Sequence, residues 1–176
     1  ERQFLAKYSS PTMVDIIYFT NQKSDNPLAE SLLKTVGFYK TGNVSLESGR
    51  ETIVRHLEEK RYDFDGLVLA DGSGLSRANK VKPISQVKFL ADVMKEKYYD
   101  DFLKSLPIAG ETGTLRRMFK SGNNYGQIFA KTGTLNGVKC LAGYIKTRDG
   151  RILSFSLLIN GYLGSVDQIK ARMEQL

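Results

Sequence analysis

A lysine, two threonines and a glycine stand together at the end of an apolar, strand-like run. They are Lys131, Thr132, Gly133 and Thr134. An ammonium group and two hydroxyls can hold an anion, and a glycine lets a substrate approach the backbone closely. A charged strand end with a glycine turn is the plainer interpretation, because three-residue motifs recur by chance. The segment is therefore a candidate site that needs support from a second motif.

That support comes from Ser24-Asp25-Asn26, which lies in a polar segment between two helical patterns. Ser-Asp-Asn and Lys-Thr-Gly, in this order, are two of the three motifs shared by penicillin-binding proteins and class A β-lactamases. The third motif, Ser-x-x-Lys, carries the nucleophile and should precede the other two. Its only matches here, Ser31 to Lys34 and Ser85 to Lys88, follow Ser24 and are no more than chance predicts.

Two further segments extend the pattern. The run Asp-Gly-Ser-Gly-Leu-Ser-Arg-x-Asn at 71–79, and Leu-Pro-Ile-Ala-Gly at 106–110 followed by Gly-Thr-Leu at 113–115, resemble signatures of one family. It is the D-alanyl-D-alanine carboxypeptidases of the low-molecular-mass, class C penicillin-binding type (peptidase family S13). The resemblance covers residues 9–176. A class A β-lactamase is disfavoured, because we find no Glu-x-x-x-Asn segment of the kind those enzymes use for deacylation.

The resemblance implies a serine peptidase that cleaves the D-alanyl-D-alanine end of peptidoglycan stem peptides, and β-lactams that acylate the same serine. It implies neither a cofactor nor a metal. Ser24 would relay a proton to the leaving amine, Asn26 would hold the substrate amide, and Lys131 would supply positive potential. These three are the implied catalytic residues of this chain.

The implied substrate-binding residues are Thr132, Gly133 and Thr134. The two threonine hydroxyls would bind the terminal carboxylate, and the Thr134 amide would be one oxyanion donor. Gly133 would leave the path along the strand open. Asp71 and its glycines are expected to shape a neighbouring loop. The echo Thr-Gly-Thr-Leu at 112–115 has no preceding lysine or strand, and we interpret it as shared turn chemistry.

Composition excludes several other classes of function. The net charge of +7 is spread along the whole chain, with no recognised module or interleaved aromatics, so nucleic acid is not an expected partner. His56 is the single histidine and lies in a polar helical pattern, which disfavours a Ser-His-Asp triad or a histidine-rich metal site. Cys140 is the single cysteine, flanked by apolar residues, and is expected to be a buried structural thiol.

Hydrophobic periodicity predicts an α+β fold in which a helical block precedes an antiparallel sheet. We expect helices at 10–20, 27–37, 48–60, 83–96, 98–106 and 165–176, a short buried strand at 66–70, and strands at 127–132, 138–146 and 152–159. Ser10, Ser48 and Ser85 are expected as caps, Gly37 as a helix end, and Asp149-Gly150 as a two-residue hairpin turn. The resemblance implies the penicillin-binding, serine β-lactamase-like fold, with the Ser-Asp-Asn loop in a helical block at 9–65 and the Lys-Thr-Gly strand in a sheet region at 125–176.

The extent of the chain is the last expectation. Residues 1–4 carry no signal peptide and no initiator Met. We therefore expect residues 1–176 to be the C-terminal portion of a penicillin-binding domain that is incomplete at its N-terminus. Its partners would be the missing N-terminal portion, the stem peptide and β-lactams, in the periplasm or cell envelope. The alternative function is a non-catalytic scaffold of the cell wall with the same fold.

Overall fold

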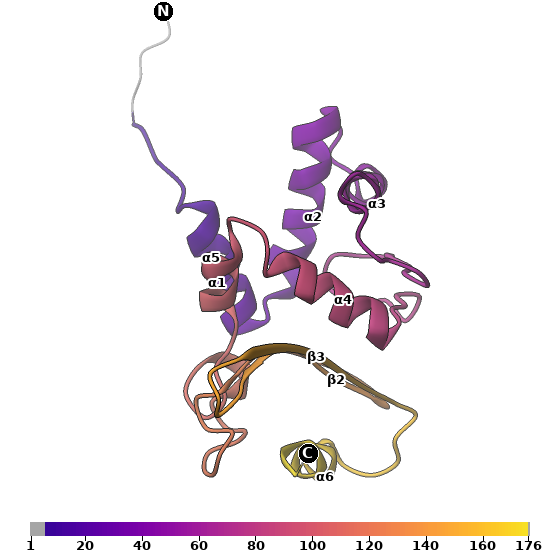
Figure 1. Ribbon diagram of the computed structural model, residues 1–176. Coiled ribbons are helices and arrows are strands. Elements are labelled where there is room, and N and C mark those ends of the chain that lie inside the picture. Colours follow the sequence, from indigo (N-terminus) through magenta and orange to yellow (C-terminus); the bar gives the residue numbers. More distant parts are fainter. Residues whose placement is uncertain (1–5, 176) are drawn as a thin grey trace, which may run out of the picture.

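A three-stranded antiparallel sheet with helices on both faces forms the fold (Figure 1). This computed structural model describes residues 6–175, so the expectations for residues 1–4 lie outside the described residues. The strand order is β1-β2-β3. In chain order the elements are α1 (Met13–Lys23), α2 (Asn26–Thr41), α3 (Leu46–Lys60), α4 (Pro83–Val93), α5 (Tyr99–Ser105), the 3₁₀ helix η1 (Gly113–Leu115), β1 (Ile128–Leu135), β2 (Val138–Lys146), β3 (Ile152–Asn160) and α6 (Val166–Glu174). The predicted α+β class and the three C-terminal strands are confirmed.

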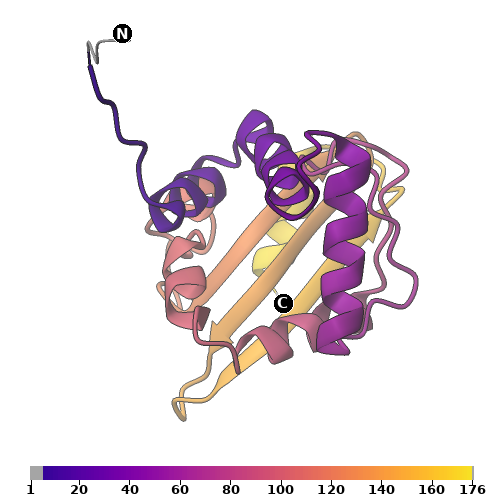
Figure 2. The ribbon, with the colours of Figure 1, turned by 90° about the horizontal axis from the view of Figure 1, so that it is seen from above.

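Helices α1 to α5 lie on one face of the sheet and α6 lies on the other (Figures 1 and 2). The period-two alternation of the strands fills both sides with apolar residues. Tyr144, Leu90 and Leu106 form a buried cluster on the side of α4 and α5. The larger cluster on the α6 side is made of Ala109, Leu115, Met118, Phe119, Ile128, Ala130, Leu141, Ile169 and Met173. Because the sheet is packed on both faces, residues of β1 belong to both clusters. Among the described residues, no helix is long and apolar enough to cross a membrane.

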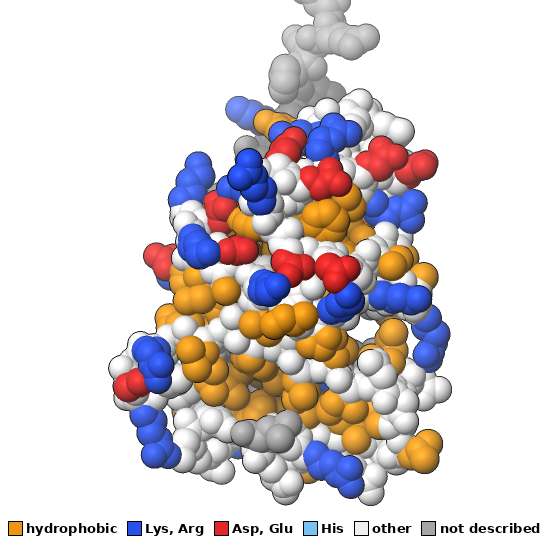
Figure 3. Space-filling view, turned by 45° about the vertical axis from the view of Figure 1, so that its right-hand side comes forward, with side chains coloured by type: hydrophobic (Ala, Val, Ile, Leu, Met, Phe, Trp, Pro, Cys, Tyr) orange, Lys and Arg blue, Asp and Glu red, His pale blue; other side chains and the backbone are white. Residues whose placement is uncertain are grey.

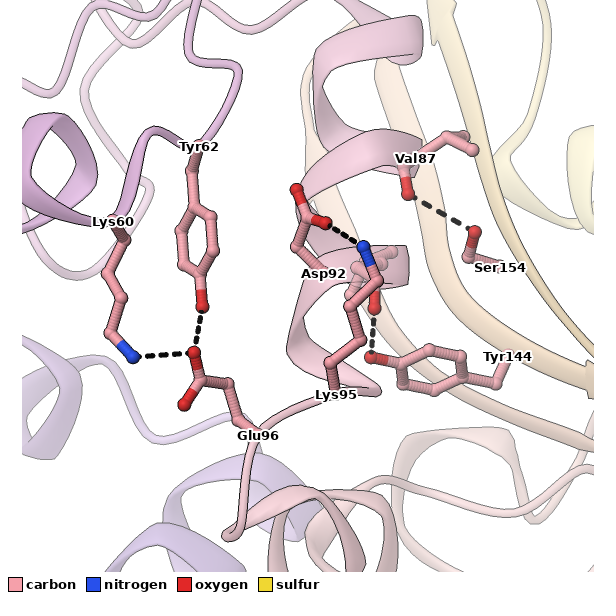
Figure 4. Close-up of polar contacts among 9 residues, drawn as sticks. Lys60, Tyr62, Val87, Asp92, Lys95, Glu96, Tyr144 and Ser154 are labelled. Carbon is pink, nitrogen blue, oxygen red and sulfur yellow. Dashed lines mark hydrogen bonds and ion pairs between the residues drawn. The ribbon is translucent and has the colours of Figure 1, made fainter.

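Polar contacts fix α4 to its neighbours (Figure 4). The hydroxyl of the fully buried Tyr144 on β2 donates to the Leu90 carbonyl at 2.9 Å. Another donor from the sheet, the Ser154 hydroxyl on β3, reaches the Val87 carbonyl at 3.1 Å. These bonds anchor the helix to two strands of the sheet.

The hairpin between β2 and β3 differs from the predicted two-residue turn. Thr147 N–H donates to the Arg151 carbonyl at 2.8 Å, and Gly150 N–H donates to the Thr147 carbonyl at 3.0 Å. Gly150 has φ +83°. The connection is therefore a three-residue loop, in which a turn is followed by a glycine in the left-handed region.

Several predicted boundaries in the helical block are wrong. The first helix is capped by Thr12, two residues after Ser10, and α3 is capped by Ser45, while Ser48 is buried inside α3. Gly37 does not end α2, because the helix continues to Thr41 and its C-cap is Gly42.

Gly37 instead permits close packing of α2 on α3. A Cβ atom at Gly37 would lie 2.5 Å from the Gly49 nitrogen and 2.5 Å from the Ser48 hydroxyl. The strand predicted at 66–70 is also wrong, since that segment forms only an isolated bridge between Val68 and Lys80. Val68 is 45% exposed, so apolar composition alone misjudged its burial.

Candidate active site

The two motifs meet in space. The Lys131 ammonium lies 2.6 Å from the Ser24 hydroxyl oxygen, although the residues are 107 positions apart. It also donates to the Thr132 carbonyl at 2.8 Å. An ammonium group donates hydrogen bonds and accepts none, so the Ser24 oxygen is the acceptor. The Ser24 hydroxyl hydrogen is thereby left free to point at another group.

Local geometry of the turn between α1 and α2 presents Ser24. Ser24 is the C-cap of α1 and takes the left-handed conformation, with φ 54°. Asp25 caps α2 by accepting from the Leu28 amide at 2.8 Å, and Asn26 opens that helix ahead of Pro27. Left-handed backbone is uncommon for a residue other than glycine, and such residues often lie at functional sites. The sharp turn presents Ser24 to Lys131, whereas Asp25 caps α2 and Asn26 is the first residue of that helix.

The outer edge of β1 is open beside these residues. Along the first half of the strand, the Ala130 amide donates to the Pro107 carbonyl at 3.0 Å, and the Ile128 carbonyl accepts from Ala109. Beyond Ala130, the outer edge has no backbone partner among the described residues. Backbone groups alternate along a strand, so Thr132 and Thr134 turn their N–H and C=O groups toward this open edge.

Thr114 is a site neighbour that the sequence did not indicate. The Thr132 hydroxyl donates to the Thr114 hydroxyl oxygen at 2.9 Å. Thr114 lies in η1, and the preceding Gly113 packs tightly, because a Cβ there would lie 2.6 Å from the Gln22 side chain. Of the two Thr-Gly-Thr-Leu copies, the one at 112–115 has turn geometry, with Gly113 at φ +54°, whereas the one at 132–135 lies within β1. The repeat was the one sequence signal that singled out Thr114, and the two copies meet through this hydroxyl contact.

A glycine-rich loop, residues 71–79, lies near the far end of β1. The Arg77 guanidinium donates to the Asn136 carbonyl in the β1–β2 turn at 3.0 Å. The Glu30 carboxylate of α2 accepts from the amides of Gly72 and Ser73 at 2.8 and 3.1 Å. The loop is thus tied to both the helical block and the strand.

Asp71 organises the interior of that loop. Burial alone would raise the pKa of its carboxyl, but hydrogen bonds from the Asn79 side chain and the Ser76 and Gly74 amides outweigh burial and lower the pKa. A carboxylate whose oxygens are occupied by loop donors serves structure. This geometry agrees with the prediction that Asp71 shapes a loop beside the site.

Burial sets the charge state of the site. Burial, together with the positive charge of Lys139, lowers the pKa of Lys131 from 10.5 to about 8. Lys131 is therefore mostly cationic at neutral pH but can release a proton far more easily than an exposed lysine. Lysines with lowered pKa values are suited to proton transfer.

The remaining candidates take no part in this constellation. Ser85 is buried and donates to the Asp65 carbonyl at 3.1 Å, whereas Lys88 pairs with Asp63 at 2.7 Å. Ser85 is not the cap of α4, whose N-cap is Lys82. Ser31 is exposed on α2.

The single histidine and the single cysteine also lie outside this constellation. His56 is exposed on α3, as predicted, and Cys140 is half-buried, less than predicted. Residues 6–175 contain no group of three or more His, Cys, Asp or Glu side chains that could hold a metal ion.

Comparison with known proteins identifies the family. Residues 1–176 match the D-Ala-D-Ala carboxypeptidase 3 (S13) family. The chain belongs to this family. It is 36% identical over 163 residues to the D-alanyl-D-alanine carboxypeptidase DacB of Haemophilus influenzae, covering 91% of this chain and 34% of that protein. It is 34% identical over 169 residues to an Actinomadura D-alanyl-D-alanine carboxypeptidase, covering 93% of this chain and 31% of the relative.

Solved structures give the same assignment. Penicillin-binding protein 4 (dacB) from H. influenzae, in complex with a novel β-lactam, matches with a TM-score of 0.80 and 33% identity, over 87% of this S13 chain and 36% of that one. The TLA-1 extended-spectrum β-lactamase matches with a TM-score of 0.67 and 17% identity over 90% of this chain and 59% of that one, which shows the fold alone. The penicillin-binding, serine β-lactamase-like fold is confirmed. The chain spans about a third of the length of the curated relatives it matches.

Proposed function

We propose that this chain supplies one wall of the active site of a serine-type D-Ala-D-Ala carboxypeptidase and endopeptidase acting on peptidoglycan stem peptides. The observation that carries the proposal is the 2.6 Å contact between the Lys131 ammonium and the Ser24 hydroxyl, beside an open strand edge. Membership of the S13 family supports the reaction class. An extracytoplasmic location follows from the substrate.

The geometry suits transfer of an acyl group to a serine. A substrate strand laid along the open edge of β1 would meet the outward amide of Thr134, a candidate oxyanion donor. The Thr134 hydroxyl would bind its terminal carboxylate, and the Thr132 hydroxyl would join it by turning its hydrogen away from Thr114. Ser24, with its oxygen held by Lys131, would pass a proton to the leaving amine, and Asn26 would hold the substrate amide.

We propose that the nucleophilic Ser-x-x-Lys pair comes from an N-terminal portion outside this sequence. Neither Ser31 nor Ser85 contacts the Lys131–Ser24 pair. The relatives are about three times longer than the aligned region. A nucleophile supplied by another segment, which β-lactams would acylate, fits both observations.

The exposed surface supports such a partner. β3 has no strand on its outer side among the described residues, and most of its residues are half-buried. On the face of the molecule that Figure 3 shows, hydrophobic side chains (orange) gather in the lower half, below a band in which acidic and basic side chains alternate. An unpaired, partly apolar strand edge is a site for pairing with a further segment.

The experiment measures D-alanine release from an N-acylated D-Ala-D-Ala peptide by the full-length enzyme that contains this chain. Ser24→Ala and Lys131→Met should each lower kcat/KM by about 10²- to 10⁴-fold. Lys146→Met, which removes an exposed lysine of the same sheet, should change it less than about twofold. A wild-type enzyme that binds peptidoglycan but releases no D-alanine would overturn the proposal in favour of a scaffold.

A further inference from the structure

A second lysine lies under the substrate-binding strand. Lys139 on β2 pairs in register with Thr134 on β1, so the two side chains share one face of the sheet. Lys139 is only 4% exposed. Its ammonium donates to the Thr134 hydroxyl oxygen. This lysine has no role in the chemistry set out above.

Lys139 has no counter-ion within the described part of the chain. None of the ion pairs among residues 6–175 includes it. Burial and the nearby charge of Lys170 lower the pKa of Lys139. Buried cations are usually paired, because an uncompensated charge in the interior is costly. An unpaired cation beneath an exposed hydroxyl therefore favours the arrival of an anion there.

The hydrogen bond also fixes the direction of the Thr134 hydroxyl. An ammonium group cannot accept, so the Thr134 oxygen must accept and its hydrogen must point elsewhere. Thr134 is exposed at the open edge of β1. The hydroxyl hydrogen is thus available to a ligand, and the bond from a cation makes that hydroxyl a better donor.

We propose that Lys139 is a positioning residue that selects substrates with a free C-terminal carboxylate, by orienting the Thr134 hydroxyl and by supplying positive charge behind it. This inference rests on the proposed carboxypeptidase function. It adds a residue that reaches the substrate only through Thr134, and it predicts a preference for an anionic peptide end over a neutral one.

The test compares two peptides in the full-length enzyme: N-acyl-D-Ala-D-Ala, and the same peptide with its terminal carboxylate converted to an amide. Lys139→Met should raise KM for the acid at least about tenfold, leave kcat within about threefold, and leave KM for the amide unchanged. Lys139→Arg should restore most of the preference, and Lys146→Met is the matched control for loss of a lysine from the same strand. Thermal melts verify that each variant is folded.

The outcomes separate the two proposals. Equal losses on acid and amide, or no loss on either, would overturn the role of Lys139 while leaving the enzyme assignment intact. A folded wild-type enzyme that cleaves neither peptide would overturn the proposed function and this inference with it. A variant Lys139→Met that fails to fold shifts the decision to Lys139→Gln, for which the same selective loss on the acid is expected.

Discussion

Replacing Lys131 with methionine should make the protein more stable at neutral pH, and this gain should shrink as the pH rises. Lys131 is a buried cation whose pKa falls from 10.5 to about 8 on folding. Between these two values the unfolded chain keeps a proton that the folded chain has released. The free energy of unfolding of the wild type therefore rises with pH across this window. Methionine fills a similar volume without a charge.

The magnitude follows from the two pKa values. With a pKa of about 8 in the folded chain and 10.5 in the unfolded chain, the buried ammonium lowers the free energy of unfolding by about 3 kcal/mol at pH 7 and about 1 kcal/mol at pH 10. The gain from Lys131→Met should therefore fall by about 2 kcal/mol between these pH values. Loss of the hydrogen bonds to Ser24 and Thr132 offsets part of the gain by about 1 kcal/mol for each bond. A neutral amine can still donate to both oxygens, so this offset is the same at pH 7 and at pH 10 and leaves the pH dependence unchanged.

The assay is urea denaturation of wild type, Lys131→Met and Lys146→Met at pH 7 and at pH 10. For Lys131→Met alone, the difference from the wild type in the free energy of unfolding should depend on pH, and the denaturant slopes should be unchanged. A stability difference that is the same at pH 7 and pH 10 would refute the claim that the site holds its lysine at a cost to the fold.

Three further predictions concern the scaffold. Gly37→Ala should destabilise the protein by about 1–3 kcal/mol in a thermal melt, because its Cβ would lie 2.5 Å from Gly49 N, whereas alanine at an open helical position would stabilise. Tyr144→Phe should cost about 1 kcal/mol in the same assay by removing the buried bond to Leu90, and no measurable cost would contradict that bond. Glu30→Gln should speed hydrogen exchange at the two amides of the glycine-rich loop that it holds, and unchanged protection would show that the loop is fixed by other contacts.

The strands of the sheet were predictable because the signals that specify them lie within short segments of the sequence. Long apolar runs and the Asp149-Gly150 turn signal predict strands without knowledge of the partner helices, although the turn proved to be a three-residue loop. Helix ends were less predictable, since Gly37 serves as a packing position on α3 and the buried Ser48 donates to the Asn43 carbonyl ahead of its helix. Chain order and composition cannot distinguish a glycine that ends a helix from one that permits close contact.

The site was predictable only in part. The resemblance named Ser24 and Lys131, and the fold brings them to 2.6 Å. Thr114 and Lys139 were missed because their roles arise from contacts with Thr132 and Thr134 across strands and turns. Such contacts depend on register and tertiary packing, which residue spacing within one segment does not contain.

The most direct test of the central claim is the location of the serine that a β-lactam acylates. The full-length enzyme is labelled with a fluorescent penicillin, digested, and mapped by mass spectrometry, and the isolated 176-residue chain is treated in parallel. The account predicts one adduct, on a serine of the N-terminal portion, no adduct on the isolated chain, and slower labelling of Lys131→Met. An adduct on Ser24, Ser31 or Ser85 would contradict it.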